Sequence, residues 1–262
     1  MRYLPLFLLA VPVAGQVATP RLSLDADGAI VAKLRRGRPL FVNALLTHSV
    51  RTGAANPLVL SPPGGGWVDG LKLVVLDGTG QEATWPMAPL GSPESTSLVL
   101  PQRARVPMGW LLPSSETSKL DIGKYTLRVI LSISDSAGWN GSVRSGSVTV
   151  QVEDEPTELT DSEKRQLGLL RVREARVGGT ALEQWGILSG LLTRWPQDVA
   201  VLTAVSHYFD AAGSPVIALA YSEAAFDAFL NMAVARQAPP PDLAALRARL
   251  RMQVAATSSG RR

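Results

Sequence analysis

Short apolar runs alternate with polar turns rich in glycine, proline, aspartate and serine between residues 21 and 152. In Tyr125–Ile133 and Ser147–Val152, apolar and polar residues alternate with a period of two. This period is typical of a β-strand with one face in a core. Strands are predicted at residues 22–24, 30–34, 40–46, 57–60, 71–76, 97–100, 105–112, 125–133 and 142–152. Many short strands with frequent turns indicate an all-β sandwich.

The period changes after a charged linker at residues 153–159, which contains Pro156. Thr160–Glu163 and Thr180–Glu183 have the pattern of capping boxes, with threonine at the N-cap and glutamate three residues later. Each box predicts the start of a helix. The second helix is expected to turn one apolar face inward, formed by Leu182, Trp185, Leu188, Leu191 and Leu192.

Further helices are predicted from Asp198 and from Ser214–Pro215, where proline suits the first helical position. Pro239–Pro241 ends the second of these, and an arginine-rich helix follows from Asp242 to about Val254. We therefore predict a two-part protein, with the sandwich at 16–152, the linker at 153–159, an all-α region at 160–254 and a flexible tail at 255–262.

The first residues, 1–15, have the composition of a signal peptide. Arg2 supplies a basic end, residues 3–14 form an apolar run, and small residues precede Gln16. The run is short for a membrane span. We expect a protein outside the cytoplasm, periplasmic or secreted, with no membrane span after cleavage; an uncleaved anchor or a hydrophobic first strand is the alternative. The chain contains no cysteine, which excludes disulfides and a lipoprotein anchor.

The segment Asp121–Leu127 resembles the Asp-x-Gly-x-Tyr-x-Cys entry to the F strand of immunoglobulin domains. The resemblance implies that Tyr125 bonds back to the backbone at a corner. It also implies that residues 125–133 and 142–152 are the terminal F and G strands. Leu127 stands in the place of the cysteine, so the domain would be a variant without a disulfide.

The third and fourth predicted helices resemble a tetratricopeptide repeat. Small residues fall where such helices pack closely, at Ser206, Ala218 and Ala225, and Gly213 lies at the turn. One repeat alone does not bury its face. The pair is therefore expected to pack within a bundle of four or five helices, or to continue onto the sandwich.

No motif for catalysis, a metal or a cofactor is present. The two histidines, His48 and His207, fall in different predicted domains. Glycosidase-type carboxylate pairs need not be close in sequence, so a hydrolase remains an alternative. The formal net charge is +4, but the excess of basic residues is divided between the sandwich and the tail. A nucleic-acid-binding protein usually gathers its basic residues on one face, so this division indicates that nucleic acid is not the partner.

Two basic clusters have two interpretations. Lys33–Arg38 is read as a solvated hairpin tip, with contact to an anionic surface as the alternative. The arginines at 247, 249 and 251 could serve the same contact, although their spacing does not line one helix face.

Aromatic residues give the candidate partner-binding positions. Four tryptophans fall at predicted strand ends or loops, where they could bind a protein, stack on a glycan or close the ends of the core. Two tyrosines lie in the groove expected between helices. The candidates are Trp67, Trp85, Trp110, Trp139, Tyr208 and Tyr221.

These features together predict an exported, non-enzymatic protein-interaction or scaffold protein that has a protein partner in the cell envelope and needs no cofactor. One alternative is a carbohydrate-binding or inhibitor-like module, which would need the loop tryptophans in one exposed patch. The other is a hydrolase, which would need paired carboxylates in a cleft with perturbed pKa values.

Overall fold

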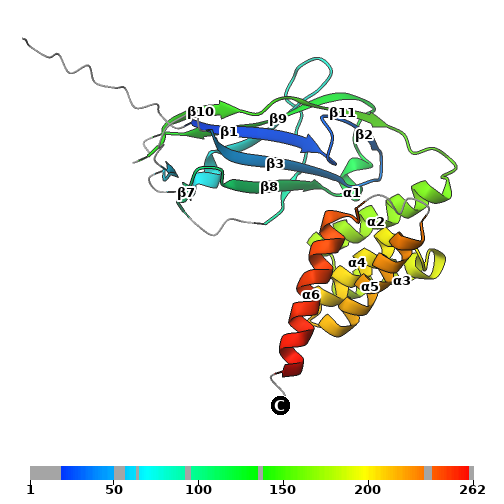
Figure 1. Ribbon diagram of the computed structural model, residues 1–262. Helices are drawn as coiled ribbons and strands as arrows, with labels where there is room; N and C mark the ends of the chain where they lie inside the picture. The colour runs from blue at the N-terminus through cyan, green and yellow to red at the C-terminus, as the bar shows by residue number, and fades with distance from the viewer. Residues whose placement is uncertain are drawn as a thin grey trace, which may run out of the picture. The chain divides into compact units, whose positions relative to one another are not determined.

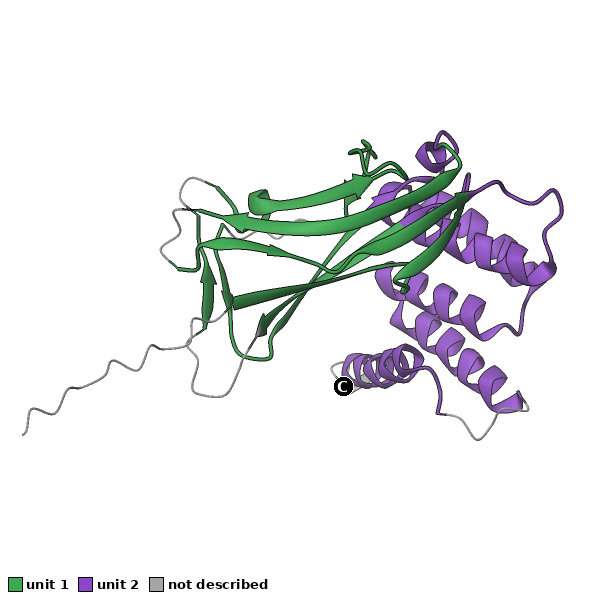
Figure 2. Cartoon of the chain, turned by 90° about the horizontal axis from the view of Figure 1, so that it is seen from above, with its two compact units in different colours: residues 1–34, 41–110, 121–152 green, residues 35–40, 111–120, 153–262 purple. Residues whose placement is uncertain are grey.

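The computed structural model describes residues 19–49, 57–62, 65–91, 96–134, 138–232 and 238–259. The predicted signal peptide at 1–15 and the last residues of the predicted tail, 260–262, lie outside the described residues. Contacts divide the chain into two units (Figure 2). Unit 1 comprises Met1–Leu34, Phe41–Trp110 and Asp121–Val152, and unit 2 comprises Arg35–Leu40, Leu111–Leu120 and Glu153–Arg262.

The strands precede the long helices along the chain (Figure 1). They are β1 (Thr19–Ala26), β2 (Val31–Arg35), β3 (Leu40–Ser49), β4 (Leu58–Leu60), β5 (Leu71–Leu76), β6 (Ala88–Pro89), β7 (Leu98–Leu100), β8 (Arg105–Leu112), β9 (Gly123–Ile133), β10 (Gly141–Arg144) and β11 (Val148–Glu153). A 3₁₀ turn, η1 (Trp67–Gly70), precedes β5, and a short helix, α1 (Ser114–Thr117), precedes β9.

Two larger sheets form the two layers of the strand region (Figure 1). One has the order β1-β3-β8-β6, and the other joins β2, β11 and β10 to one side of β9 and β5 to its other side. Along β9 every second side chain is buried, from Tyr125 to Ile133. The alternation read from the sequence therefore reports the face that packs into the core. Strands β4 and β7 form a separate pair.

The predicted strand at 142–152 is in fact two, β10 and β11, separated at Ser145–Ser147. Their pairing with β9 shifts by one residue across this break, which is the pattern of a β-bulge. Ser145 donates its backbone N–H to the carbonyl oxygen of Val129 (2.9 Å), and the N–H of Val129 donates to Oγ of Ser145 (3.0 Å). Before the bulge the core-facing residues have odd numbers, as at Val143, and after it they have even numbers, as at Val148 and Val150.

The corner before β9 contains the hydrogen bond that the immunoglobulin resemblance implied. The hydroxyl of Tyr125 donates to the backbone carbonyl of Asp121 over 3.1 Å. Burial and the negative charge of Asp121 raise the pKa of Tyr125, so the phenol keeps its proton.

The helical region contains α2 (Asp161–Gly178), α3 (Ala181–Arg194), α4 (Val199–Ala211), α5 (Pro215–Asn231) and α6 (Pro241–Ser259). The first four begin where the sequence predicted, and α6 begins one residue earlier than predicted. Thr160 and Glu163 form the full capping box of α2, and Thr180 accepts a hydrogen bond from the N–H of Glu183 at the start of α3. No helix among the described residues has the length and apolarity that crossing a membrane requires.

Two details of the predicted helices were wrong. Helix α6 continues to Ser259, so residues 255–259 are helical rather than a flexible tail. Leu182 is 81% exposed instead of facing inward. It lies in the first turn of α3, where Ala181 and Glu183 are exposed as well. The buried residues of α3 lie further along the helix, at Leu188 and Leu191.

The small residues of α4 and α5 do lie at a close contact, as predicted. Ala218 and Ala225 are fully buried, and the hydroxyl of Ser206 donates to the carbonyl of Ala218 over 2.7 Å. A buried serine costs stability unless it is paired, and this bond pairs it with the facing helix. Helix α6 covers the same pair of helices through Leu243, Leu246 and Leu250.

Candidate functional site

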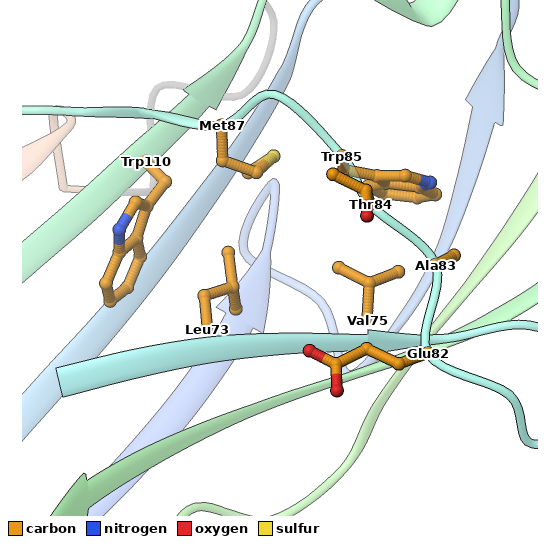
Figure 3. Close-up of a pocket in the computed structure, with 8 residues that line it drawn as sticks. All are labelled: Leu73, Val75, Glu82, Ala83, Thr84, Trp85, Met87 and Trp110. Atoms are coloured by element: carbon orange, nitrogen blue, oxygen red, sulfur yellow. The ribbon is translucent and has the colours of Figure 1, made fainter.

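A pocket of about 230 Å³ lies within unit 1, between the edge strands of its two larger sheets. Strand β5 is at the edge of one sheet and β6 at the edge of the other. The lining of the pocket comes from β5, from the segment that joins β5 to β6, and from β8 (Figure 3). The lining residues are Leu73, Val75, Glu82, Ala83, Thr84, Trp85, Met87 and Trp110.

A tight turn at Asp77–Gly80 brings the joining segment back along β5. Asp77 accepts hydrogen bonds through Oδ1 from the hydroxyl of Thr79 (2.7 Å) and from the N–H groups of Thr79 and Gln81 (each 2.9 Å). These bonds, the Thr79 hydroxyl first, lower the pKa of Asp77. Gly80 has a φ of +84°, which favours glycine. The turn thereby positions the segment after it, whose residues 82–85 and 87 contribute to the lining of the pocket.

The two tryptophans of the pocket differ in exposure. Trp85 is only 8% exposed, and its ring packs on Tyr125 with centroids 5.0 Å apart. Trp110 is half-buried on β8, and Figure 3 shows Met87 and Leu73 between the two indole rings. The indole of Trp110 is therefore more accessible to an incoming group than that of Trp85.

Glu82 is the one titratable side chain among the residues that line this pocket. Its Oε1 lies 2.8 Å from Nζ of Lys72, and both side chains are more than half exposed. An ion pair this exposed contributes little to stability, on the order of 0–1 kcal/mol. The ion pair lies on the face of β5 opposite Leu73 and Val75, so the wall of the pocket is mainly apolar.

The other two candidate tryptophans lie elsewhere in unit 1. Trp67 is fully buried in η1, as expected of a residue that closes the end of a core. Trp139 is half-buried and donates its backbone N–H to the carbonyl of Val59 on β4 (2.8 Å). The four tryptophans therefore do not form the single exposed patch that a glycan-binding module would need.

Tyr208 and Tyr221 belong to the aromatic part of the helical core in unit 2. The ring of Tyr208 stacks on Trp185 with centroids 5.3 Å apart, and Tyr221 stacks on Phe209 at 5.7 Å. Both tyrosines pack against the buried cluster around Leu188. Their rings therefore contribute to packing between helices, and each is only partly exposed.

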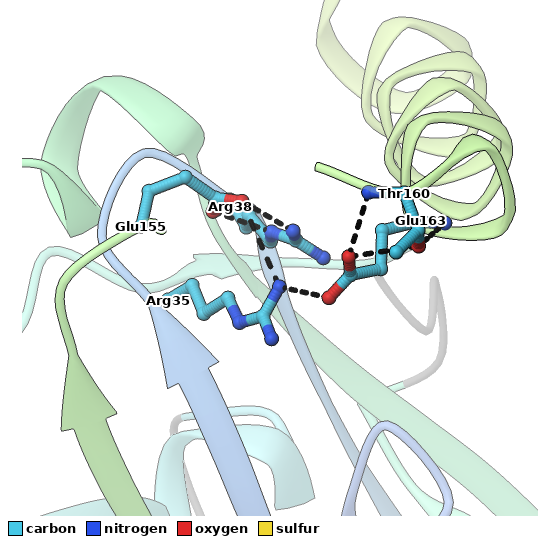
Figure 4. A network of polar contacts seen from close by, with 5 residues as sticks. All are labelled: Arg35, Arg38, Glu155, Thr160 and Glu163. Carbon is cyan, nitrogen blue, oxygen red and sulfur yellow. Dashed lines mark hydrogen bonds and ion pairs between the residues drawn. The ribbon is translucent and has the colours of Figure 1, made fainter. Parts of the chain in front are cut away.

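The three arginines of the basic cluster, Arg35, Arg36 and Arg38, pair with acidic residues of the linker and of α2 inside unit 2, which the sequence did not predict (Figure 4). Arg38 donates through Nε to Glu155 (2.6 Å), and Arg35 donates to Glu163 (2.6 Å). Arg36 lies 3.1 Å from Asp154. These three arginines are therefore bound within the chain rather than presented as a free hairpin tip.

Glu163 is the carboxylate most strongly affected. The backbone N–H of Thr160, the guanidinium of Arg35 and the hydroxyl of Thr160 all hydrogen-bond to it, in that order of effect. Together they lower its pKa to about 2. The same side chain thus completes the cap of α2 and binds Arg35.

The arginines of α6 are also paired within the chain. Arg247 and Arg251 bind Glu223 at 2.6 and 2.7 Å, and Arg249 binds Asp210 at 2.6 Å. The guanidinium of Arg247 also lies 3.9 Å from the ring centroid of Phe226. The arginines at 247, 249 and 251 do not line one face of α6. They therefore bind carboxylates on two helices, Asp210 on α4 and Glu223 on α5.

Within the described ranges, no cluster of three or more histidine, cysteine, aspartate or glutamate side chains could hold a metal ion. His48 is buried on β3. His207 lies half-buried on α4, and burial lowers its pKa. The two histidines belong to different units, as their positions in the sequence predicted.

Comparison with known proteins gives distant likenesses only. No family model matches the chain, and no curated protein matches it. A family 123 glycoside hydrolase from Clostridium perfringens aligns over 61% of this chain and 36% of its own length, with 11% identity and a TM-score of 0.33. BcpA, the major pilin subunit of Bacillus cereus, aligns over 51% of this chain and 40% of its own, with 9% identity and a TM-score of 0.20.

A third structure concerns T-cell activation by the superantigen toxic shock syndrome toxin-1. One of its chains aligns over 52% of this chain and 99% of its own, with 7% identity and a TM-score of 0.26. By comparison, the present chain spans only about a third of the length of the glycoside hydrolase. At such low scores these likenesses carry no argument about activity.

Proposed function

We propose that this chain is an exported, non-enzymatic interaction protein whose β-sandwich binds another protein at the pocket between β5, β8 and the β5–β6 segment. The observation that carries the proposal is the lining of this pocket. It combines two tryptophans, a methionine and aliphatic side chains, whereas its one titratable residue, Glu82, pairs with Lys72 on the other face of β5. Tryptophan and methionine are enriched at protein interfaces. A glycosidase would need two opposed carboxylates, so this lining favours binding over hydrolysis.

The finer fold assignments are part of the same proposal. We assign unit 1 to the immunoglobulin-like sandwiches, because its sheet orders correspond to strands A-B-E-D and A′-G-F-C of that fold. The bond from Tyr125 to Asp121 supports the assignment. We assign α4 and α5 to tetratricopeptide-like packing on their small-residue contact. Export rests on the composition of residues 1–15 and is tested by cell fractionation.

The test is mild crosslinking in the native envelope, followed by affinity capture on the full chain from Gln16. Trp110→Ala removes an indole that lines the pocket. Trp139→Ala is its matched control, because Trp139 is also half-buried in unit 1 but lies outside the pocket. A protein captured by the unmodified chain and by Trp139→Ala, but not by Trp110→Ala, supports the proposal. Equal capture by all three chains, or binding to a glycan array with no captured protein, refutes it.

A further inference from the structure

The edge of β5 that faces away from β9 has backbone groups with no hydrogen-bond partner among the described residues. Ala83 donates its N–H to the carbonyl of Val75 (2.8 Å), so Val75 directs its backbone toward this free edge. Backbone direction alternates along a strand, so Leu73 directs both its N–H and its C=O the same way. No described residue hydrogen-bonds to Leu73 on this side.

The chain itself shows how this edge pairs. Residues 81–83 run antiparallel to β5, with Asp77 donating to Gln81 (2.8 Å), Ala83 donating to Val75, and Leu76 opposite Glu82. Continuing this register would place the residue at 85 opposite Leu73. The chain leaves the edge before that point, because the ring of Trp85 packs on Tyr125. As far as the described residues go, one half of the edge is thus covered and the other half is open.

An added strand on the open half would direct a side chain into the pocket. Residues directly opposite each other in an antiparallel pair point to the same face. Leu73 lines the pocket, so the residue that exchanges hydrogen bonds with it would place its own side chain beside Leu73, Met87 and Trp110 (Figure 3). Its neighbours would point to the other face, where Lys72 and Glu82 form their ion pair.

We propose that an extended segment of a partner protein adds to β5 as a further strand, with one apolar anchor residue opposite Leu73 and polar residues on either side of it. This inference rests on the proposed function and specifies its partner. The added strand continues the line of residues 81–83 beyond the point where the chain turns away. Strand addition of this kind draws its affinity from backbone hydrogen bonds and its specificity from alternate side chains.

A second copy of the chain does not fit this edge in the register that is centred on Leu73. If two β5 strands paired antiparallel about Leu73, Val75 of one copy would face Leu71 of the other. The carbonyl of that Val75 already accepts the N–H of Ala83 from its own chain. The covering segment of each copy would therefore occupy the position that the other strand needs. A partner segment without such a cover has no equivalent obstacle.

The probe is a linear heptapeptide selected by phage display on the full chain and then synthesised in three forms. One form is unmodified, one is N-methylated at the apolar anchor, and one is N-methylated at the residue next to it. The anchor N–H is the donor to the carbonyl of Leu73, whereas the neighbouring N–H points away from β5. We expect at least tenfold weaker binding for the anchor-methylated form alone. We also expect slower amide exchange at Leu73 when the unmodified peptide is bound.

Two protein variants complete the test. Leu73→Pro removes the outward N–H, which an edge strand tolerates, and should abolish peptide binding. Val31→Pro is the control on β2, the opposite edge of the same sheet: Ile30 accepts from Thr149, so the N–H of Val31 points outward. Val31→Pro should leave binding unchanged.

Equal binding of both methylated peptides, or unchanged exchange at Leu73, would overturn strand addition. If Trp110→Ala nevertheless abolished binding, the pocket would remain the binding site and only the strand mode would fail. If Trp110→Ala also had no effect, the proposed function would fail with it. Self-association that Leu73→Pro removes would overturn the assignment to a partner protein.

Discussion

A matched pair of glycine substitutions tests how closely α2 approaches α3. A methyl group at Gly168 would overlap the side chain of Leu191 and lie 3.2 Å from its Cγ, whereas one at Gly186 would meet no atom within 4 Å. In a helix, alanine is favoured over glycine by about 0.8–1 kcal/mol. Gly186→Ala should therefore raise the free energy of unfolding by roughly 1 kcal/mol.

Gly168→Ala gains the same helix propensity but must displace Leu191, which is buried in the helical core. Overpacking of a well-packed core costs about 1–3 kcal/mol. The propensity gain cancels when the two variants are compared. Gly168→Ala should therefore be about 1–3 kcal/mol less stable than Gly186→Ala. At this chain length, each 1 kcal/mol corresponds to a Tm difference of roughly 2–4 °C.

The assay is urea unfolding of the full chain, followed by circular dichroism at 222 nm, which reports chiefly on the helices. Gly168→Ala combined with Leu191→Ala is the control, because truncating Leu191 removes the overlap. The double variant should lose less stability than the sum of the two single losses. If Gly168→Ala were as stable as Gly186→Ala, the inferred contact between α2 and α3 would be wrong.

Three further outcomes are expected. The folded pKa of Glu163, about 2, lies below its ordinary value of 4.5, so its contribution to stability is present above pH 4.5 and is lost as the pH falls toward 2; the difference in urea midpoint between the unmodified chain and Glu163→Gln should shrink over that range. Tyr125→Phe should lower the free energy of unfolding by about 1 kcal/mol, because a backbone acceptor loses its donor; urea unfolding measures this loss, and an unchanged midpoint would contradict it. Arg247→Ala should cost more than Arg251→Ala, because Arg247 is the more buried of the two partners of Glu223; thermal unfolding compares them, and the opposite order would show that burial does not govern this pair.

Much of the secondary structure could be predicted because its signals are local. Period-two runs gave the strands, and side-chain caps at Thr160 and Thr180 gave the starts of two helices. The bulge at Ser145–Ser147 was missed, although a signal for it is present. Apolar residues occupy the odd position Val143 and then the even position Val148, so an unbroken strand would turn one of them away from the core.

The candidate site was less predictable, because it depends on contacts between distant parts of the chain. Tryptophan near a strand end can close a core or line a pocket, and the two cases look alike in the sequence. The turn at Asp77 brings Trp85 to the pocket that Trp110 also lines, whereas Trp67 is fully buried elsewhere in unit 1. The pairing of Arg35 with Glu163 joins residues 128 positions apart, which no local pattern reveals.

This long-range pairing determines where the chain can usefully be cut. A single break at the start of the linker, before Asp154, is the natural choice from the sequence, yet it would separate the acidic residues from Arg35, Arg36 and Arg38. It would also remove α1, whose first N–H binds Glu174 on α2. A helical fragment made in this way would begin with several carboxylates that have lost their cationic partners. Internal deletions that spare residues 35–40 and 111–120 would keep that set of charges intact.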